Sequence, residues 1–190
     1  MTGDAATLRF IFGAEVDCSD GHSGRLRLVV VDAEARALIN LVVEPGHWRG
    51  GRLVPVELVD SAGAEVRLSC SRADFESLQP AKAIDYGAKS QTPGMHMTVW
   101  EYAVEAGEVK TRGGDPVYAM DGEIGRIQGF LVDRATYDLT HVFLDEGHLW
   151  GTKEVAIPMS AVTALGGGIG LSLTIDQVRE LPPVDAQAHP

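Results

Sequence analysis

Two histidines stand in matching sequence contexts and could supply chemistry near neutral pH. His47 follows a glycine and precedes Trp48, and His148 follows a glycine and lies two residues before Trp150. Imidazole groups can bind a metal ion or respond to pH. Each context offers one histidine with no second histidine or cysteine nearby, so at most two ligands would meet, fewer than a zinc site requires. We therefore interpret both as loop histidines that hydrogen-bond the backbone.

Four aspartates also recur in matching contexts and could act as paired acids and bases. Asp20 and Asp121 each precede a glycine, and Asp32 and Asp133 each follow an apolar run typical of a strand. An Asp-Gly pair is common in hairpin turns, and an aspartate after a strand forms an Asx turn. Turn formation explains all four residue types, so we predict turns here and no catalytic residues.

Arg25 and Arg126 could bind an anion, and the three glycines at 166–168 could cradle a phosphate. Acidic residues outnumber basic ones, so each arginine is expected to pair with a neighbouring carboxylate. The glycine run lacks the lysine and the serine or threonine that follow in a phosphate-binding loop. Neither feature therefore predicts an anion site, and no Ser-His-Asp or Cys-His arrangement has local support.

The Gly-flanked connections that hold the two histidines also carry large apolar side chains. An apolar residue on a loop tip gains burial only when something covers it, and tryptophan is frequent among interface anchors. The cover would be another part of the same chain or a partner protein. The candidate interaction loops comprise His47, Trp48, His148, Leu149 and Trp150.

The composition describes a folded, acidic chain. It has 190 residues, of which 45% are hydrophobic and 23% charged, and its net charge is −11 at pH 7. That length allows one large domain or two small ones. The negative charge argues against direct binding of nucleic acid or of an anionic membrane, both of which need a positive field. The residues predict no metal and no other cofactor.

The sequence repeats itself with an offset of 101 residues. Between positions 13–54 and 114–155, 13 of 42 ungapped positions are identical, where chance would give about 3. A two-residue insertion then shifts the offset to 103, and identities continue up to Pro80 and Pro183. Identities in this order predict two copies of one fold.

The repeat also bears on Cys18 and Cys70, the two cysteines of the chain. They align with Ala119 and Leu173. Two thiols do not make a disulfide framework. Apolar residues at the matching positions indicate that both cysteines are small buried hydrophobic side chains rather than nucleophiles.

Short β-branched runs recur in both copies. Strands are expected at 25–31, 38–43, 53–59 and 65–68, and at 127–132, 139–144, 155–157 and 169–173. Such spacing is typical of a small barrel or sandwich. Each copy ends with a helix signal, capped by Ser71 or Thr174 and ended by prolines. An extra strand is expected at 97–104, with 8–12 as its counterpart.

The uncharged stretch at 157–175 is long enough to span a bilayer. It aligns, however, with 54–72, a stretch that holds five charged residues. Two copies of one fold should not place one segment in lipid and its twin in water, so we predict no membrane insertion. The first residues lack the basic and apolar regions of a signal peptide, and the expected location is the cytoplasm.

The ordered set of motifs resembles the PRC-barrel family. The second copy carries Asp-Gly-Glu-Ile-Gly-Arg at 121–126, Glu-Gly-His-Leu-Trp-Gly at 146–151 and Glu-Val-Ala-Ile-Pro at 154–158, and the first copy matches more loosely at 20–25 and 46–50. The resemblance implies a small β-barrel that serves as an interaction module. It transfers the fold better than the function.

The predicted fold class is all-β with short helices: two tandem PRC-like β-barrels, each closed by a short C-terminal helix. The predicted boundaries are 1–80 and 114–183 for the barrels, 81–113 for a linker and 184–190 for a flexible tail. The expected function is a non-enzymatic adaptor that binds protein partners, with a homodimer as one open assembly. Two alternatives stay open: a ribosome- or RNA-associated factor acting through ribosomal proteins, and a ligand-binding protein or enzyme with a site between the barrels.

Apolar strand faces are expected to hold the copies together. Both copies are negative, −4 over 1–80 (8 basic, 12 acidic) and −6 over 111–190 (5 basic, 11 acidic), and like charge disfavours association. The expected contact residues are Val29, Val31, Ile39 and Val42, with Phe130, Val132 and Phe143. The expected core comprises Leu26, Leu28, Val30, Leu41, Val43, Val66 and Leu68, with Ile127, Leu131, Val142, Leu144, Ile169 and Leu171.

Overall fold

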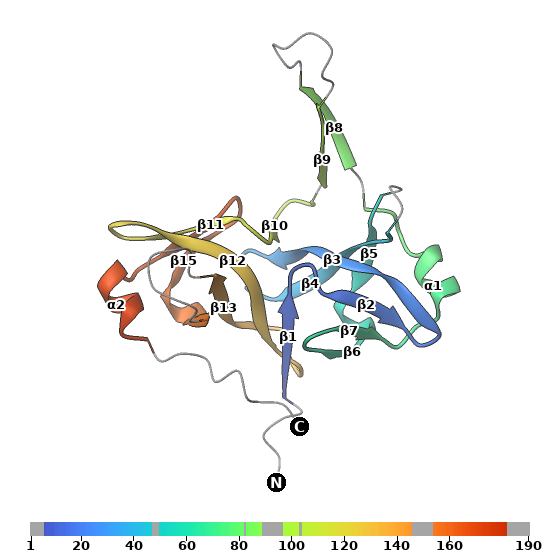
Figure 1. The fold of residues 1–190 in the computed structure, drawn as a ribbon, viewed down its shortest axis with the longest axis horizontal. Coiled ribbons are helices and arrows are strands. Elements are labelled where there is room, and N and C mark those ends of the chain that lie inside the picture. The colour runs from blue at the N-terminus through green and yellow to red at the C-terminus, as the bar shows by residue number, and fades with distance from the viewer. Residues whose placement is uncertain are drawn as a thin grey trace.

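The computed structural model describes residues 6–46, 50–81, 83–88, 97–102, 104–145 and 154–181. Within these residues the chain is almost entirely β, with two short α-helices and two 3₁₀ turns (Figure 1). We call residues 13–81 the first half and residues 113–181 the second half. The all-β prediction is confirmed.

The two halves contain the same elements in the same order. The first half comprises β2 (Glu15–Cys18), β3 (Gly21–Asp32), β4 (Leu38–Glu44), β5 (Arg52–Pro55), η1 (Val56–Leu58), β6 (Val59–Ala62), β7 (Val66–Leu68) and α1 (Arg72–Ser77). The second half comprises β11 (Pro116–Ala119), β12 (Gly122–Asp133), β13 (Leu139–Asp145), β14 (Glu154–Pro158), η2 (Met159–Ala161), β15 (Val162–Leu165), β16 (Ile169–Leu171) and α2 (Ile175–Arg179). The remaining strands are β1 (Thr7–Ile11), β8 (Ala83–Ala88), β9 (Met97–Tyr102) and β10 (Glu108–Arg112).

Each half forms one sheet with the same strand order. The order is β5-β4-β3-β2-β7-β6 in the first half and β14-β13-β12-β11-β16-β15 in the second. The strands at the two ends of each path are joined by the three residues of η1 or η2, which span at most about 10 Å. Each sheet must therefore curl until its ends almost meet, which gives a barrel-like shape, and the shared order confirms the predicted repeat.

Both closing helices begin where the sequence predicts. Ser71 and Thr174 each accept a hydrogen bond from the backbone of the third helical residue, and that residue bonds back to complete a capping box. Each helix buries one apolar side chain, Phe75 in α1 and Val178 in α2. The helices are short, so this burial holds them against the sheets.

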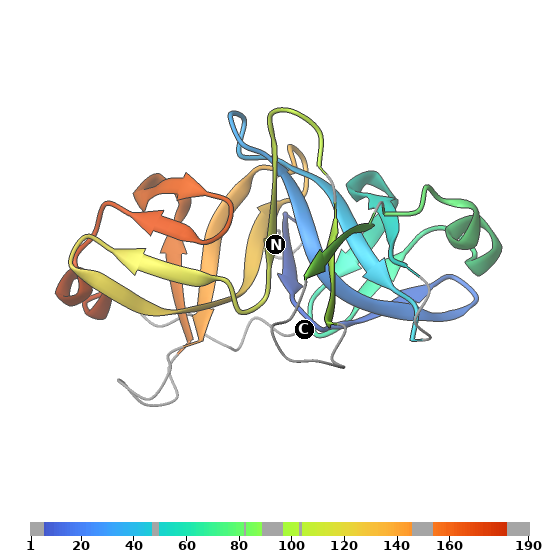
Figure 2. The ribbon, with the colours of Figure 1, turned by 90° about the horizontal axis from the view of Figure 1, so that it is seen from above.

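The first strand of the chain pairs with the second half rather than the first. β1 runs antiparallel to β12, with Phe10 opposite Phe130, while β10 runs antiparallel to β3, with Thr111 opposite Val29. The two strands precede their own halves at the same offset of 101 residues, so each half donates its leading strand to the other. The prediction that residues 97–104 correspond to 8–12 is wrong, although a strand does form there as β9. Figure 2 shows β10 beside β3 and β1 between the sheets.

Reciprocal contacts relate the two halves by an approximate two-fold axis. Ala37 forms an antiparallel bridge with Asp138, its own equivalent. The amide of Leu38 donates to the carbonyl of Tyr137 at 2.8 Å, and the amide of Leu139 donates to the carbonyl of Arg36 at 2.9 Å. Such exchange between equivalent residues is the pattern of a two-fold interface.

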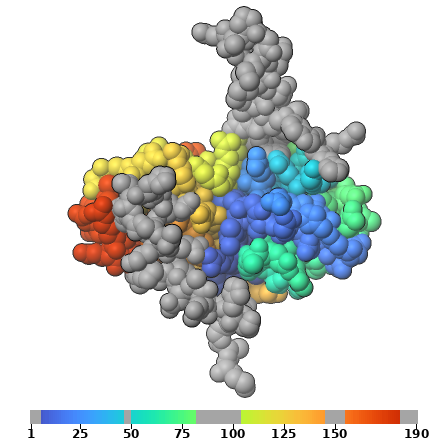
Figure 3. Space-filling view, viewed as in Figure 1, coloured from blue at the N-terminus to red at the C-terminus, as the bar shows by residue number. Residues whose placement is uncertain are grey.

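The strand exchange merges the apolar interiors of the halves. One hydrophobic cluster holds Leu8 and Phe10 of β1 together with core residues from both sheets. The rings of Phe12 and Phe130 meet edge to face, with their centroids 6.1 Å apart. In the space-filling view the blue surface of the first half meets the yellow and orange surface of the second directly (Figure 3). The predicted packing of the copies on each other is confirmed.

The residues at this contact differ partly from the expected set. Val29, Val31, Phe130 and Val132 belong to the shared cluster, as predicted. Val42 instead packs with Leu28 and Val30 in a separate cluster on the other face of the first sheet. Phe143 is buried beneath Arg9, whose guanidinium lies 4.6 Å from the ring centroid.

A β-bulge in β3 explains why the alternating sequence pattern of this strand assigned some side chains to the wrong face of the sheet. The register between β3 and β4 shifts between Leu26 and Leu28, so both Leu26 and Val29 reach the shared cluster while Leu28 turns to the opposite face. A bulge inserts one extra residue and reverses which face the following side chains take. The predicted core residues are nevertheless buried, except Leu131, which is half-buried.

Strands β8 and β9 form a separate two-stranded sheet, which stands away from the other two (Figure 1). The stretch 157–175 comprises parts of β14 and η2 to α2 rather than one continuous segment. Among the described residues, no helix has the length and apolar character needed to cross a membrane.

Candidate functional site

The predicted interaction loops contain five named residues that the structure does not describe. His47, Trp48, His148, Leu149 and Trp150 all lie outside the described residues. The predicted flexible tail at 184–190 lies outside them as well.

The predicted turn aspartates and paired arginines have the expected contacts. Asp32 Oδ1 accepts hydrogen bonds from the amides of residues 34 and 35, and Asp133 Oδ1 accepts those of residues 135 and 136. Arg25 pairs with Glu15, and Arg126 pairs with Glu123 at 2.9 Å. These contacts stabilise the turns and strand ends of the fold. The predicted Asx turns and the predicted pairing of each arginine with a carboxylate are confirmed.

Asp20 and Asp121 have a role that sequence reasoning missed. Asp20 Oδ1 accepts a hydrogen bond from the amide of Arg72 at 2.7 Å, and Asp121 Oδ1 accepts one from the amide of Ile175 at 2.8 Å. Both amides belong to the first residue of a helix, where no partner exists within the helix. Each aspartate thus ties the tip of a hairpin to the closing helix of its half. Their recurrence before a glycine in both copies was the available signal.

The second half presents an apolar face around the hairpin of β11 and β12. Tyr118 is 46% exposed and Met120 is 72% exposed. Gly168 lies beside Tyr118, because a Cβ on this glycine would stand 3.6 Å from the Tyr118 ring. Gly166 and Gly167 are exposed next to it. We call Tyr118, Met120 and Gly166–Gly168 the Tyr118 face.

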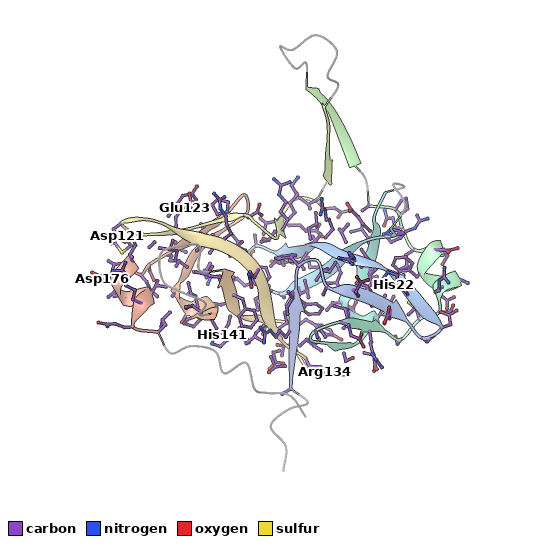
Figure 4. All side chains as sticks on the ribbon, in the orientation of Figure 1. His22, Asp121, Glu123, Arg134, His141 and Asp176 are labelled. Atoms are coloured by element: carbon purple, nitrogen blue, oxygen red, sulfur yellow. The ribbon has the colours of Figure 1, made fainter. Side chains whose placement is uncertain are left out.

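Glu123 lies opposite Tyr118 in the pairing of β11 with β12, and two further acidic residues lie at the same end of the second half. Asp121, Glu123 and Asp176 gather at the same end of the molecule (Figure 4). Glu123 is paired with Arg126, and Asp176 is paired with Arg179 at 3.0 Å, but exposed pairs of this kind hold their partners weakly. The three acids outnumber the two arginines that pair with them.

The same face of the first half is charged instead of apolar. Asp17 and Ser19 occupy the positions of Tyr118 and Met120. His22 Nδ1 lies 3.0 Å from Asp17 Oδ1, and His22 Nε2 lies 3.2 Å from Glu15 Oε2. Arg67 and Glu65 stand where the second half has Gly170 and Gly168, and they pair at 2.5 Å. Polar pairing covers this face, whereas the Tyr118 face has no equivalent cover in the described residues.

A hollow lies near the two-fold axis, between the end of β1 and the second half. Its volume is about 450 Å³, and it is lined by Ile11, Phe12, Gly113, Gly114, Arg126, Ile127 and Gln128. Phe12 and Gly113 are equivalent residues that touch at the axis, because a Cβ on Gly113 would stand 2.7 Å from the Phe12 Cβ. The lining is mostly apolar side chain and backbone, with one exposed guanidinium.

The two cysteines lie together in the first half. Cys18 is buried in the shared cluster, as predicted, and Cys70 is half-buried against it. Burial and the neighbouring Cys18 thiol raise the pKa of Cys70 to about 11. The hydroxyl of Ser23 donates a hydrogen bond to Cys18 Sγ at 2.9 Å. Both cysteines are free thiols.

No group of three or more histidine, cysteine, aspartate or glutamate side chains suited to a metal ion occurs within the described ranges. His141, half-buried on β13, has its pKa lowered by that burial. Its Nδ1 lies 3.2 Å from the hydroxyl of Thr140.

Comparison with known proteins relates one part of the chain to a family. No curated protein matches the chain. The family model of the PRC-barrel domain matches residues 113–172. That range holds β11 to β16, which is the second sheet without the donated β1 and without α2. Residues 113–172 are therefore similar to the PRC-barrel domain.

Proposed function

We propose that this protein is a non-enzymatic adaptor that binds a basic protein partner through the Tyr118 face. The observation that carries the proposal is the exposure of Tyr118 and Met120 on a rigid hairpin whose counterpart in the first half is polar. Tyrosine is enriched among the residues that dominate binding energy. Methionine adapts its shape to varied apolar surfaces.

Charge argues for the class of partner. The second half carries −6, Glu123 lies opposite Tyr118, and Asp121 and Asp176 lie at the same end of the molecule as Glu123 (Figure 4). A negative rim favours partners with positive charge and speeds their encounter. The occupant we propose is a protein segment that inserts an apolar side chain beside Tyr118 and places lysine or arginine against the acidic rim.

We also infer that the first half is a second PRC-barrel copy. Support comes from the identities at offsets of 101 and 103 residues and from the shared strand order. The exchanged strands β1 and β10 would then join two copies of one module into a single rigid adaptor. One copy would keep the apolar face, and the other would serve as its support.

The test replaces the face with the residues of the first half. Tyr118→Asp combined with Met120→Ser gives the second half the side chains of Asp17 and Ser19. Proteins that bind the wild type but not this variant are candidate partners. The deciding measurement is the affinity of a purified candidate, which should weaken by at least about tenfold in the variant and fall as salt rises.

His22→Gln is the matched control, because His22 lies on the equivalent face of the first half. It should leave the affinity unchanged. Ribosomal proteins are one class of basic protein to test as candidate partners. Sedimentation velocity shows whether the bound partner is a second copy of this chain or a different protein. Equal affinity of the wild type and the Tyr118→Asp/Met120→Ser variant for each purified candidate would contradict the proposal.

The hollow near the two-fold axis supports a second candidate function, the binding of a small ligand between the end of β1 and the second half. Arg126 is the one charged side chain in its lining, so the ligand would carry a carboxylate or another small anionic group. Arg126→Gln should abolish any rise in melting temperature that a series of small carboxylates produces. A series that leaves the wild-type melting temperature unchanged would remove this candidate.

A further inference from the structure

One small region of the first half contains sulfur and oxygen atoms where the second half is apolar. Cys18, Ser23 and Cys70 correspond to Ala119, Ile124 and Leu173. Cys18 and Ser23 are buried, and Cys70 is half-buried. Because the second half has apolar side chains at the three equivalent positions, the fold itself does not require the two thiols and the hydroxyl.

The backbone around the two cysteines is part of the shared scaffold. The amide of Ser19 donates to the carbonyl of Cys70 at 3.0 Å, and the amide of Met120 donates to the carbonyl of Leu173 at 2.9 Å. In the first half this contact brings the end of β2 beside the residue that precedes the cap of α1. The neighbouring Cys18 thiol also contributes to the raised pKa of Cys70, so the two side chains lie close together.

We propose that Cys18 and Cys70 form a redox-active dithiol, which a low-molecular-weight disulfide such as oxidised glutathione converts into an intramolecular disulfide. The inference is independent of the Tyr118 face. Cys70 is the entry point because it is the more exposed of the two thiols. Disulfide exchange proceeds by attack of a thiolate on a disulfide sulfur.

The first step joins Cys70 to glutathione. The Cys70 thiol loses its proton to solvent, and its sulfur attacks one sulfur of oxidised glutathione. The glutathione S–S bond breaks, and one glutathione thiolate leaves and takes up a proton. The product is a mixed disulfide on Cys70.

The second step closes the protein disulfide. Cys18 loses its proton and its sulfur attacks Cys70 Sγ, which releases the second glutathione as a thiolate. In total the two protein thiols lose two protons and two electrons, and one oxidised glutathione becomes two reduced ones. The Ser23 hydroxyl, which donates to Cys18 Sγ at 2.9 Å, holds the Cys18 sulfur in place for this attack. Ser23 is thus a positioning residue.

The surroundings of Cys70 set the pH dependence of the first step. Burial, the facing Cys18 thiol and the Asp74 carboxylate on α1 all raise the pKa of Cys70, to about 11. The thiolate is therefore scarce at neutral pH, and the reaction should accelerate about tenfold per pH unit between pH 7 and 9. At neutral pH we therefore expect the disulfide to form slowly.

The disulfide would fix the contact between the first hairpin and the closing helix. Residue 18 ends β2 and residue 70 precedes α1, and Asp20 already accepts a hydrogen bond from the amide of Arg72 across the same gap. A covalent link there removes freedom from the unfolded chain. We expect the melting temperature to rise by about 5 °C or more on oxidation.

The experiment treats the reduced full-length protein with oxidised glutathione at several pH values and follows intact mass. The wild type should lose two hydrogens without retaining glutathione. Cys18→Ala, which copies Ala119, should keep one glutathione on Cys70. Cys70→Leu, which copies Leu173, should react at least about tenfold more slowly, because Cys18 is buried. Ser23→Ala should accumulate the mixed disulfide that the wild type passes through.

The melting temperatures of the reduced variants show whether each has kept its fold, and both cysteine replacements use residues that the second half already accommodates. A stable glutathione adduct on the wild type would overturn the proposal. So would disulfides between chains, or two thiols that stay unmodified at pH 9 while a small model thiol reacts. Closure at the same rate in Ser23→Ala would remove the role of Ser23.

Discussion

The first and second halves share a scaffold and differ in what they place on it. Both keep the Asx turns, the capping boxes and the aspartate that ties a hairpin tip to a helix. The first half covers its outer hairpin with ion pairs and holds two thiols, whereas the second half exposes Tyr118 and Met120 on the equivalent hairpin. Contacts that hold the backbone have therefore stayed alike in the two halves, while several exposed side chains and some buried ones have diverged.

The exchanged strands β1 and β10 differ in sequence, although each one pairs with a strand of the other half. β1 brings Phe10 into the shared cluster, and β10 brings Thr111 to the equivalent place. Phe10 is 1% exposed and Thr111 is also 1% exposed. The Thr111 hydroxyl is buried without a hydrogen-bond partner among the described residues. The two strands should therefore contribute unequally to the joining of the halves.

Phe10→Ala should have the largest effect on stability. It removes a buried ring from the strand that crosses between the halves, which typically costs about 3–5 kcal/mol. Urea unfolding followed by circular dichroism measures the loss. Thr111→Ala is the matched control and should cost about 1 kcal/mol or less. Equal losses at the two positions would contradict an unequal contribution of β1 and β10.

Gly129→Leu should come next. Leu28 occupies the equivalent position in the first half, but β1 passes so close to Gly129 that a Cβ there would stand 2.0 Å from the Phe10 carbonyl oxygen. The added side chain must push β1 off β12, at a cost of about 3 kcal/mol. Gly63→Ala is the control, because no atom lies within 4 Å of a Cβ at Gly63. A variant as stable as this control would show that β1 can shift without loss.

Much of the fold could be predicted because repeated identities mark the turns and caps. Asp32 with Asp133 and Ser71 with Thr174 have local partners, so their types and spacing were enough. The strand exchange could not be predicted, because β1 and β10 share no identical residue at the offset of 101. The bulge in β3 was missed for another reason: a register shift depends on the partner strand, which alternation along one strand does not reveal.

The candidate sites were harder to predict than the fold. The sequence does not mark Tyr118 and Met120 as exposed. They become notable only when the structure shows that their equivalents, Asp17 and Ser19, lie on the same face of the first half. Cys18 and Cys70 are 52 residues apart and meet only because β2 and β7 run parallel. Their apolar counterparts correctly indicated burial, but the contact between the two thiols depends on the tertiary fold.

Removal of either hairpin aspartate should have a moderate and equal effect. Asp20→Ala and Asp121→Ala each leave the first amide of a helix without its acceptor, which costs about 1 kcal/mol. Asp20→Asn and Asp121→Asn keep an acceptor oxygen and should recover most of the loss. Denaturant midpoints compare the four variants. A loss at one site alone would show that the closing helices differ in importance between the halves.

Thr111→Val should stabilise the protein. Valine matches threonine in shape and removes a buried hydroxyl that has no partner in the described part of the chain. Release of that desolvation cost is worth about 1 kcal/mol. The midpoint of urea unfolding should rise, opposite in sign to Phe10→Ala at the equivalent position. A lower midpoint would indicate that the hydroxyl has a bound water or another partner.

The smallest expected effect is a pH dependence at His141, whose counterpart in the first half is Asn40. Burial lowers the pKa of His141 in the folded state below its ordinary value, so the unfolded chain binds this proton more readily. Stability from the neutral ring is present above pH ~6.5 and is lost as pH falls through the lower folded-state pKa. His141→Asn copies the first half and should flatten the slope of unfolding free energy against pH between 7 and 5. Identical slopes in the wild type and the variant would mean that His141 is as well solvated in the folded protein as in the unfolded chain.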